Sequence, residues 1–140
     1  MQPTYLPYLG YFHLIAAADV FVFLDDVQFA RRSWQQRNRI LGQAGEVMLT
    51  IPVKKAEREA RVRDIEIAEE AWAAKHLESL RHAYAHRPHF AEGMAFLEAQ
   101  LAAPPARLAD FTCRLIEAAA QHLDLRAEFV RAGDLGAPGD

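Results

Sequence analysis

The chain changes character near residue 68, and this change limits the folds that it can adopt. Before it, apolar residues come in short runs such as Val20 to Leu24, separated by proline, glycine and charged residues, a pattern typical of strands joined by loops. After it, alanine and leucine dominate longer segments that are broken at Pro88 and at Pro104 and Pro105, a pattern typical of helices. The sequence therefore predicts an α/β fold, with a small mixed or parallel sheet in the N-terminal half and flanking helices mainly from the C-terminal half.

The individual elements can be placed from the same patterns. Helices are expected at residues 9–18, 70–86, 90–101 and 106–123, and strands at 20–24, at 39–41 and 47–53 as a hairpin, at 62–67 and at 127–130. We expect residues 1–140 to be a single domain, sheet-rich over 1–67 and helical over 69–124, with a terminal strand and tail over 126–140.

Composition excludes several classes of protein. The formal charge of −3 argues against nucleic acid as a partner, because phosphate backbones are bound by basic surfaces. The apolar stretch from Leu14 to Leu24 is interrupted by Asp19 and is too short to span a membrane. The single cysteine, Cys113, excludes an internal disulfide, and the sequence has no signal-peptide pattern. We therefore predict a cytoplasmic protein with neither nucleic-acid nor membrane partners.

The first candidate site element is the segment Gln2-Pro3-Thr4-Tyr5-Leu6-Pro7. The two prolines fix φ and favour extended conformations at Gln2 and Leu6, so the loop is stiff before any ligand binds. Such a turn before a helix can present backbone N–H groups to an anion. The alternative is a structural aromatic loop that closes the edge of the sheet.

The second element is the pair Asp25 and Asp26, which follows the apolar strand 20–24. Strand alternation directs the two carboxylates to opposite faces, so that one can reach a site while the other caps or pairs. Such a carboxylate could act as a general base, a Mg²⁺ ligand or a hydrogen-bond acceptor. The alternative is a turn that ends the strand.

The third element is a group of arginines interleaved with Trp34, Gln35, Gln36 and Asn38. Guanidinium groups bind phosphate or carboxylate through a planar fork, and an indole ring can stack on a ligand, so an anionic small molecule is the expected substrate. The alternative is that these side chains are solvated or paired with acids. The arginines are Arg31, Arg32, Arg37 and Arg39.

The expected helix at 70–86 carries Trp72, His76, Leu80 and Tyr84 at intervals of four residues, which predicts one buried stripe. His76 is then interpreted as a hydrogen-bonded histidine of the core or its rim. His82, His86 and His89 lack a zinc motif, and we predict no metal site. Cys113 is interpreted as a core residue.

Several blocks in the same order resemble the WbqC-like family of bacterial proteins. They include the Gln-Pro-Thr-Tyr-Leu-Pro segment, Gly10-Tyr11-Phe12, Asp19-Val20-Phe21-Val22, Asp25-Asp26-Val27-Gln28-Phe29, Trp34, Arg37-Asn38-Arg39, Leu49-Thr50-Ile51-Pro52-Val53, and Trp72 with His76, Leu80 and Tyr84.

The resemblance implies a transferase acting in the biosynthesis of surface polysaccharide such as O-antigen, or of secondary metabolites. Acyl or aminoacyl transfer to an amino sugar or amine, or a nucleotide-dependent ligation, is the implied chemistry. The alternative is a non-catalytic small-ligand or partner-binding module of the same pathways, or an inactive fragment. No cofactor can be named. The predicted catalytic residues are Asp25 and Asp26, and the predicted substrate-binding residues are Gln2, Tyr5, Trp34, Arg37 and Asn38.

This chain departs from the family pattern at both ends. Members of the family begin with an apolar strand before the Gln-Pro pair, and they continue through a further α/β portion after the region matched here. We therefore expect the 140-residue chain to be incomplete, with an exposed sheet edge through which it forms a homo-oligomer.

Overall fold

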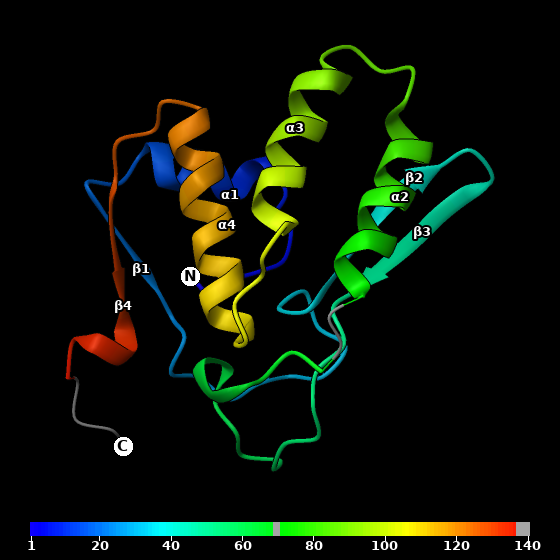
Figure 1. Cartoon of the computed structure of the whole chain (residues 1–140). Helices are drawn as coiled ribbons and strands as arrows, with labels where there is room; N and C mark the ends of the chain where they lie inside the picture. The colour runs from blue at the N-terminus through cyan, green and yellow to red at the C-terminus, as the bar shows by residue number, and fades with distance from the viewer. Residues whose placement is uncertain (69–70, 137–140) are drawn as a thin grey trace.

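The computed structural model describes residues 1–68 and 71–136, in which helices and strands follow one another in mixed order (Figure 1). The elements are α1 (Leu9–Ala16), β1 (Val20–Phe23), β2 (Arg37–Gly42), β3 (Gly45–Thr50), the 3₁₀ turn η1 (Val62–Asp64), α2 (Trp72–Tyr84), α3 (Phe90–Leu101), α4 (Leu108–His122), β4 (Glu128–Arg131) and the 3₁₀ turn η2 (Ala132–Asp134). The predicted α/β class is confirmed.

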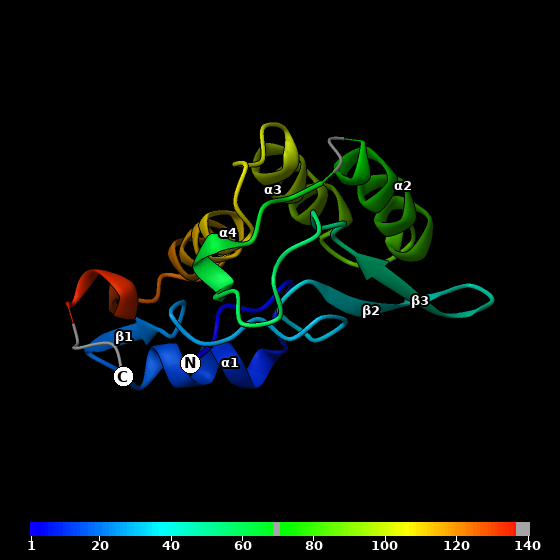
Figure 2. The ribbon, with the colours of Figure 1, turned by 90° about the horizontal axis from the view of Figure 1, so that it is seen from below.

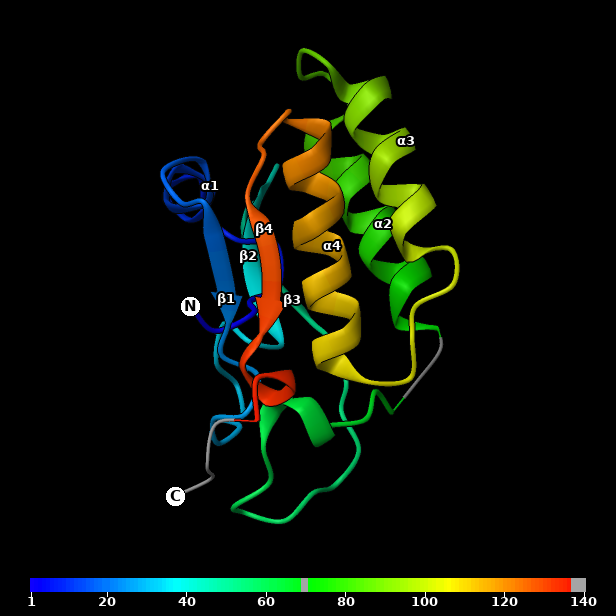
Figure 3. The same ribbon diagram turned by 90° about the vertical axis from the view of Figure 1, so that its left-hand side faces the viewer.

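The helices α2, α3 and α4 lie side by side in one layer, and the strands lie against it (Figures 2 and 3). The short helix α1 lies on the strand side of this layer. The helical layer comes from the C-terminal half of the chain, as the sequence predicts. The loop that precedes α1 passes between the hairpin and the helices, so that it can contribute to the core and to the surface.

The described strands form two sheets of two strands each, where a single sheet was expected. β1 pairs in parallel with β4, with Val20 opposite Glu128 and Phe23 opposite Arg131. β2 and β3 form the predicted antiparallel hairpin. Gly45, the first residue of β3 after the hairpin turn, has a φ of 125°, a conformation that glycine adopts without steric cost.

The strand expected at residues 62–67 is wrong over most of its length. Val62 and Ile65 are both fully buried, and a spacing of three residues matches the period of the 3₁₀ turn η1 rather than the period of a strand. The backbone N–H of Val62 donates to the carbonyl of Val27 at 2.9 Å, so this turn packs on the segment after β1. Only single bridges join Glu66 to Arg107 and Ile67 to Val53.

Two apolar cores share the helix α4. The first lies between the hairpin and the helices, and it includes Tyr5 of the N-terminal loop and Phe111 of α4. The second lies between α1, β1 and α4, and it includes Phe23 and Cys113. The predicted stripe of α2 belongs to the first core, because Trp72, His76 and Leu80 are buried and Tyr84 is half-buried.

Candidate functional site

The loop before α1 is held in a strained conformation by Asn38 of β2. Leu6 has a φ of 48°, in the left-handed region that is rare for residues other than glycine, and it directly precedes Pro7. The side-chain Nδ2 of Asn38 donates to the carbonyl of Leu6 at 2.6 Å and to the carbonyl of Tyr5 at 3.1 Å. The extended conformation expected for Leu6 is therefore wrong, because two hydrogen bonds from β2 hold the loop in a turn.

Tyr5 and His76 form a buried hydrogen-bonded chain behind this loop. The Nε2 of His76 lies 3.1 Å from the carbonyl of Thr50, which can only accept, so Nε2 carries the proton. The hydroxyl of Tyr5 therefore donates to Nδ1 of His76 across 2.9 Å. Burial lowers the pKa of His76, and the bond to Thr50 opposes this only in part. The neutral imidazole thus joins the N-terminal loop, α2 and the end of β3.

A cleft with a volume of about 760 Å³ opens between the N-terminal loop and the outer face of the hairpin, and we name it the N-terminal cleft. It is within the size range of small-molecule sites. Part of its wall is apolar and includes Met1 and Leu24. Its polar and charged residues are Gln2, Thr4, Asn38, Arg39 and Glu46.

Arg39 and Trp34 form the charged and aromatic part of the cleft wall. The guanidinium carbon of Arg39 lies 5.4 Å from the centroid of the Trp34 ring, a cation–π contact that orients the guanidinium. Nη1 of Arg39 also lies 3.1 Å from Oε2 of Glu46, but both side chains are at least half exposed. Such an exposed pair contributes only about 0.2–1 kcal/mol, so an anionic ligand could compete for Arg39.

The indole of Trp34 is presented to solvent by the two glutamines that follow it. Gln35 and Gln36 are buried, and both amides are hydrogen-bonded. Oε1 of Gln35 accepts the backbone N–H of Ala30, and its Nε2 donates to Oε1 of Gln2 at 2.9 Å. Trp34 itself is 49% exposed. Because Gln2 accepts from Gln35 through its Oε1, its own amide N–H groups stay available to the cleft.

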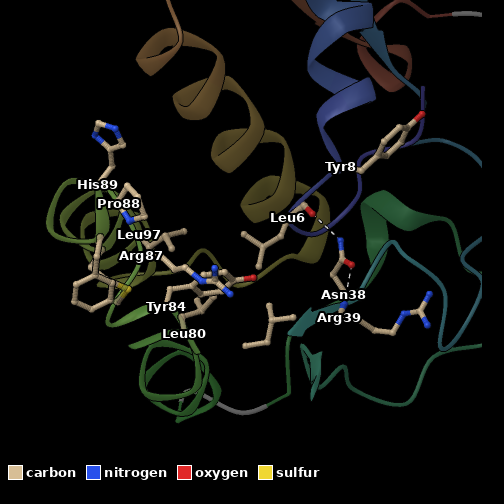
Figure 4. A pocket seen from close by; sticks show the side chains of 14 residues that line it. Leu6, Tyr8, Asn38, Arg39, Leu80, Tyr84, Arg87, Pro88, His89 and Leu97 are labelled. Carbon is tan, nitrogen blue, oxygen red and sulfur yellow. Dashed lines mark hydrogen bonds between the residues drawn. The ribbon is translucent and has the colours of Figure 1, made fainter. Parts of the chain in front are cut away.

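Tyr8 lies where the N-terminal cleft meets a second cavity. Its ring packs over Gly10, where an added β-carbon would lie 2.3 Å from a ring carbon of Tyr8. Gly10 therefore allows the ring to lie against the first turn of α1. Tyr8 is 68% exposed, and with Asn38 and Arg39 it borders both cavities. Figure 4 shows these three residues at the second cavity.

The two predicted catalytic aspartates have different surroundings. Asp25 is 3% exposed, and its Oδ1 accepts the backbone N–H of Gly133 at 3.0 Å. Nη1 of Arg63 donates to the carbonyl of the same glycine at 3.3 Å, so Asp25 and Arg63 together fix η2 beneath the strands. Asp26 is half-buried, and its carboxylate has no hydrogen-bond partner among residues 1–68 and 71–136. Neither aspartate lines the cleft.

The structure brings three of the predicted substrate-binding residues together in the N-terminal cleft, namely Gln2, Trp34 and Asn38. Tyr5 is fully buried and Arg37 lies outside the cleft, so their contacts with substrate stay predictions, as do the catalytic roles of Asp25 and Asp26. Sequence reasoning gave Arg39 less weight than Arg37. Strand alternation places both arginines on one face, and only the position of Trp34 distinguishes them.

No group of three or more histidine, cysteine or acidic side chains that could hold a metal ion is found in the part of the chain that the structure describes. Within the same residues, no helix is long and apolar enough to cross a membrane. Cys113 is buried, as predicted, and burial raises the pKa of its thiol to about 12.

Comparison with known proteins identifies the family of this chain. The uncharacterized protein Rv1507c of Mycobacterium tuberculosis (strain ATCC 25618 / H37Rv) is 39% identical over 93 residues, which are 66% of this chain and 40% of the relative. The chain thus spans less than half the length of this curated relative. No solved structure matches. The WbqC-like protein family matches residues 2–140, and the chain therefore belongs to that family.

Proposed function

We propose that the N-terminal cleft binds an anionic small molecule for a transfer reaction in surface polysaccharide or secondary-metabolite biosynthesis. The observation that carries this proposal is the guanidinium of Arg39, oriented on Trp34, which lines the same cleft of about 760 Å³ as the amide of Gln2. A fixed guanidinium next to an aromatic ring suits a ligand that carries phosphate or carboxylate together with a planar group.

A nucleotide-linked amino sugar has the chemistry that this cleft would recognise. Its diphosphate would pair with Arg39, which an exposed Glu46 only partly neutralises. Its base would stack on the exposed ring of Tyr8, and its hydroxyl groups would bond to the amide of Gln2. Acyl or aminoacyl transfer to the amine of such a sugar is the reaction that we assign to the pathway.

Asp26 is the residue that we propose as general base for that transfer. Its half-buried carboxylate has no hydrogen-bond partner among the described residues, whereas Asp25 is occupied by Gly133. A base must reach the proton that it removes, and apo geometry by itself does not rule a candidate out. The alternative, a non-catalytic binding module, is favoured by the lining of the cleft, whose only carboxylate among the described residues is Glu46.

The cellular setting belongs to the same proposal. A single buried thiol suits a cytoplasmic protein, in which no disulfide is needed. A homo-oligomer would form through an edge of one of the two-stranded sheets.

Titration with uridine diphosphate glucosamine, whose amine is free to accept an acyl group, followed by isothermal calorimetry, tests the binding. Arg39→Gln should weaken binding by at least about tenfold, since a hydrogen bond to a charged group contributes about 1.5–3 kcal/mol. Arg37→Gln is the matched control, because Arg37 lies two positions away on the same strand and outside the cleft. Equal losses in the two variants, or unchanged affinity in both, would refute the role of Arg39.

Asp26→Asn separates the enzyme from the binding module. In a transferase it should abolish turnover while the affinity for the sugar nucleotide stays within about twofold, because a general base contributes about 10²–10⁴-fold to rate and little to binding. Turnover of an amine substrate that is unaffected by this change would refute the proposed base. A wild-type chain that binds the nucleotide without turnover of any acyl or aminoacyl donor would support the module.

A further inference from the structure

A second cavity, which we name the helical cavity, lies between the N-terminal loop, β2 and the ends of α2 and α3 that meet at Pro88 (Figure 4). Its volume is about 480 Å³, which is within the range of small-ligand sites. Its walls are mainly apolar and come from Leu6, Ile40, Leu80, Phe90, Met94 and Leu97. The chemistry of these walls favours an aliphatic group over a sugar or a nucleotide.

The polar side chains that line the helical cavity are basic or neutral. Figure 4 shows the side chains of Tyr84 and Arg87 extending from the end of α2 toward Leu6 and Asn38. The guanidinium of Arg87 has no hydrogen-bond or ion-pair partner in the described ranges 1–68 and 71–136. None of the described residues that line this cavity is acidic. An anionic head group could therefore bind Arg87 without displacing an internal partner.

The wall of the helical cavity includes two residues with left-handed backbone and one helical glycine. Leu6, with a φ of 48°, and His89, with a φ of 60°, are both left-handed residues other than glycine, and both line it. Such conformations persist where the surrounding structure imposes them, and they often occur at ligand sites. Gly93 lies inside α3, where alanine would be more favourable, and an added β-carbon there would meet nothing within 4 Å. This glycine therefore leaves empty space on the wall of the cavity.

We propose that the helical cavity binds an aliphatic carboxylate, with its chain between the hairpin and α3 and its head group at Arg87. Binding of this ligand does not depend on the proposed function of the N-terminal cleft. A role for this carboxylate in a transfer reaction rests on the proposed function. Such a role would be possible because the two cavities meet at Tyr8, Asn38 and Arg39. That shared border would place the carboxyl end of the chain beside a ligand in the N-terminal cleft.

Calorimetric titration with hexanoate, octanoate and decanoate tests the proposal. Each added methylene should tighten binding about fourfold, equivalent to about 0.8 kcal/mol, until the cavity is full. Gly93→Phe fills the cavity from a position with free space, so the variant should fold normally and lose at least about tenfold in affinity for decanoate. Gly93→Ala, the matched control, should keep most of the affinity.

The head group is tested with a pair of ligands. Arg87→Gln should weaken decanoate binding about fivefold, the upper range for an exposed ion pair, and should leave the affinity for decan-1-ol unchanged. Arg58→Gln, in the loop between β3 and η1, serves as a control for net charge. Trp34→Ala should not change the affinity for decanoate, because Trp34 lines the N-terminal cleft and not the helical cavity.

The proposal is overturned by an affinity that does not rise with chain length, or by a Gly93→Phe variant that folds and binds decanoate as tightly as the wild type. Equal effects of Arg87→Gln on decanoate and decan-1-ol would remove the role of Arg87. Decanoate binding without binding of the sugar nucleotide would leave this site standing and remove the proposed function of the N-terminal cleft.

Discussion

Replacement of Asn38 by alanine removes the amide that holds the N-terminal loop. The variant loses two hydrogen bonds, at 2.6 Å to Leu6 and at 3.1 Å to Tyr5, while the loop carbonyls stay partly buried. Because each carbonyl then loses its donor while partly buried, the loss of each bond costs about 1–3 kcal/mol. Because Leu6 can then relax from its strained φ of 48°, part of this loss is offset, and we expect a net destabilisation of about 2 kcal/mol.

This free energy can be read as a shift of the melting temperature. For 140 residues, an unfolding entropy of about 2.1 cal/mol/K per residue amounts to about 0.3 kcal/mol/K, so 2 kcal/mol lowers the midpoint by about 7 °C. Differential scanning calorimetry measures the shift directly. The same variant should lose affinity at both cavities, since Asn38 lines both.

Gln43→Ala is the matched control for Asn38→Ala, because Gln43 is an exposed amide in the turn of the same hairpin. Its midpoint should stay within about 1–2 °C of the wild type, as expected for a surface substitution. If Asn38→Ala melts at the wild-type temperature and binds both ligands normally, Asn38 does not impose the loop conformation. A large drop in both variants would point instead to a general weakness of the hairpin.

Three further predictions concern buried groups. Trp72→Ala should destabilise the fold by about 3–5 kcal/mol, because the ring is 3% exposed among Tyr5 and Phe111, and an unchanged urea midpoint would contradict its place in the core. Burial lowers the pKa of His76 in the folded chain below the ordinary 6.5, so the unfolded chain binds more protons as the pH falls. The contribution of His76 to the free energy of unfolding is therefore complete above about pH 6.5 and is lost as the pH falls through the folded pKa. Urea unfolding at about pH 7.5 and about pH 5 should show a smaller difference in His76→Gln than in the wild type, and equal differences would exclude His76 as the source. Cys113, with a pKa of about 12, should react with iodoacetamide only after unfolding, and stoichiometric labelling of the native chain by mass spectrometry would contradict its burial.

Local signals in the sequence predict most of the elements. Pro88 and the pair Pro104 and Pro105 delimit the helix expected at 90–101, which the structure shows as α3. The pairing of strands is harder to predict from the sequence, because β1 pairs with β4, far along the chain, with Val20 opposite Glu128. No local pattern specifies a partner that far along the chain, so the division of the strands into two sheets could not be predicted.

Part of the lining of the N-terminal cleft could be predicted from the sequence, but the geometry of the cleft could not. Gln2, Trp34 and Asn38 were selected from the sequence, and all three line the N-terminal cleft. The hydrogen bond between Tyr5 and His76 could not be inferred from the loop, because His76 lies on a helix far along the chain. The strain at Leu6 was missed for the same reason, since the residue that imposes it is on β2.

The hydrogen bonds explain why separate blocks of the sequence resemble one family together. Asn38, from the Arg-Asn-Arg block, holds the carbonyls of the Gln-Pro-Thr-Tyr-Leu-Pro block, and Tyr5 of that block bonds to His76 of the α2 stripe. Thr50, in the block that ends β3, accepts from the same histidine. These bonds depend on one another, because Asn38 holds the loop in the conformation that brings the Tyr5 hydroxyl to the imidazole of His76. We infer that these residues act mainly by shaping the wall that both cavities share.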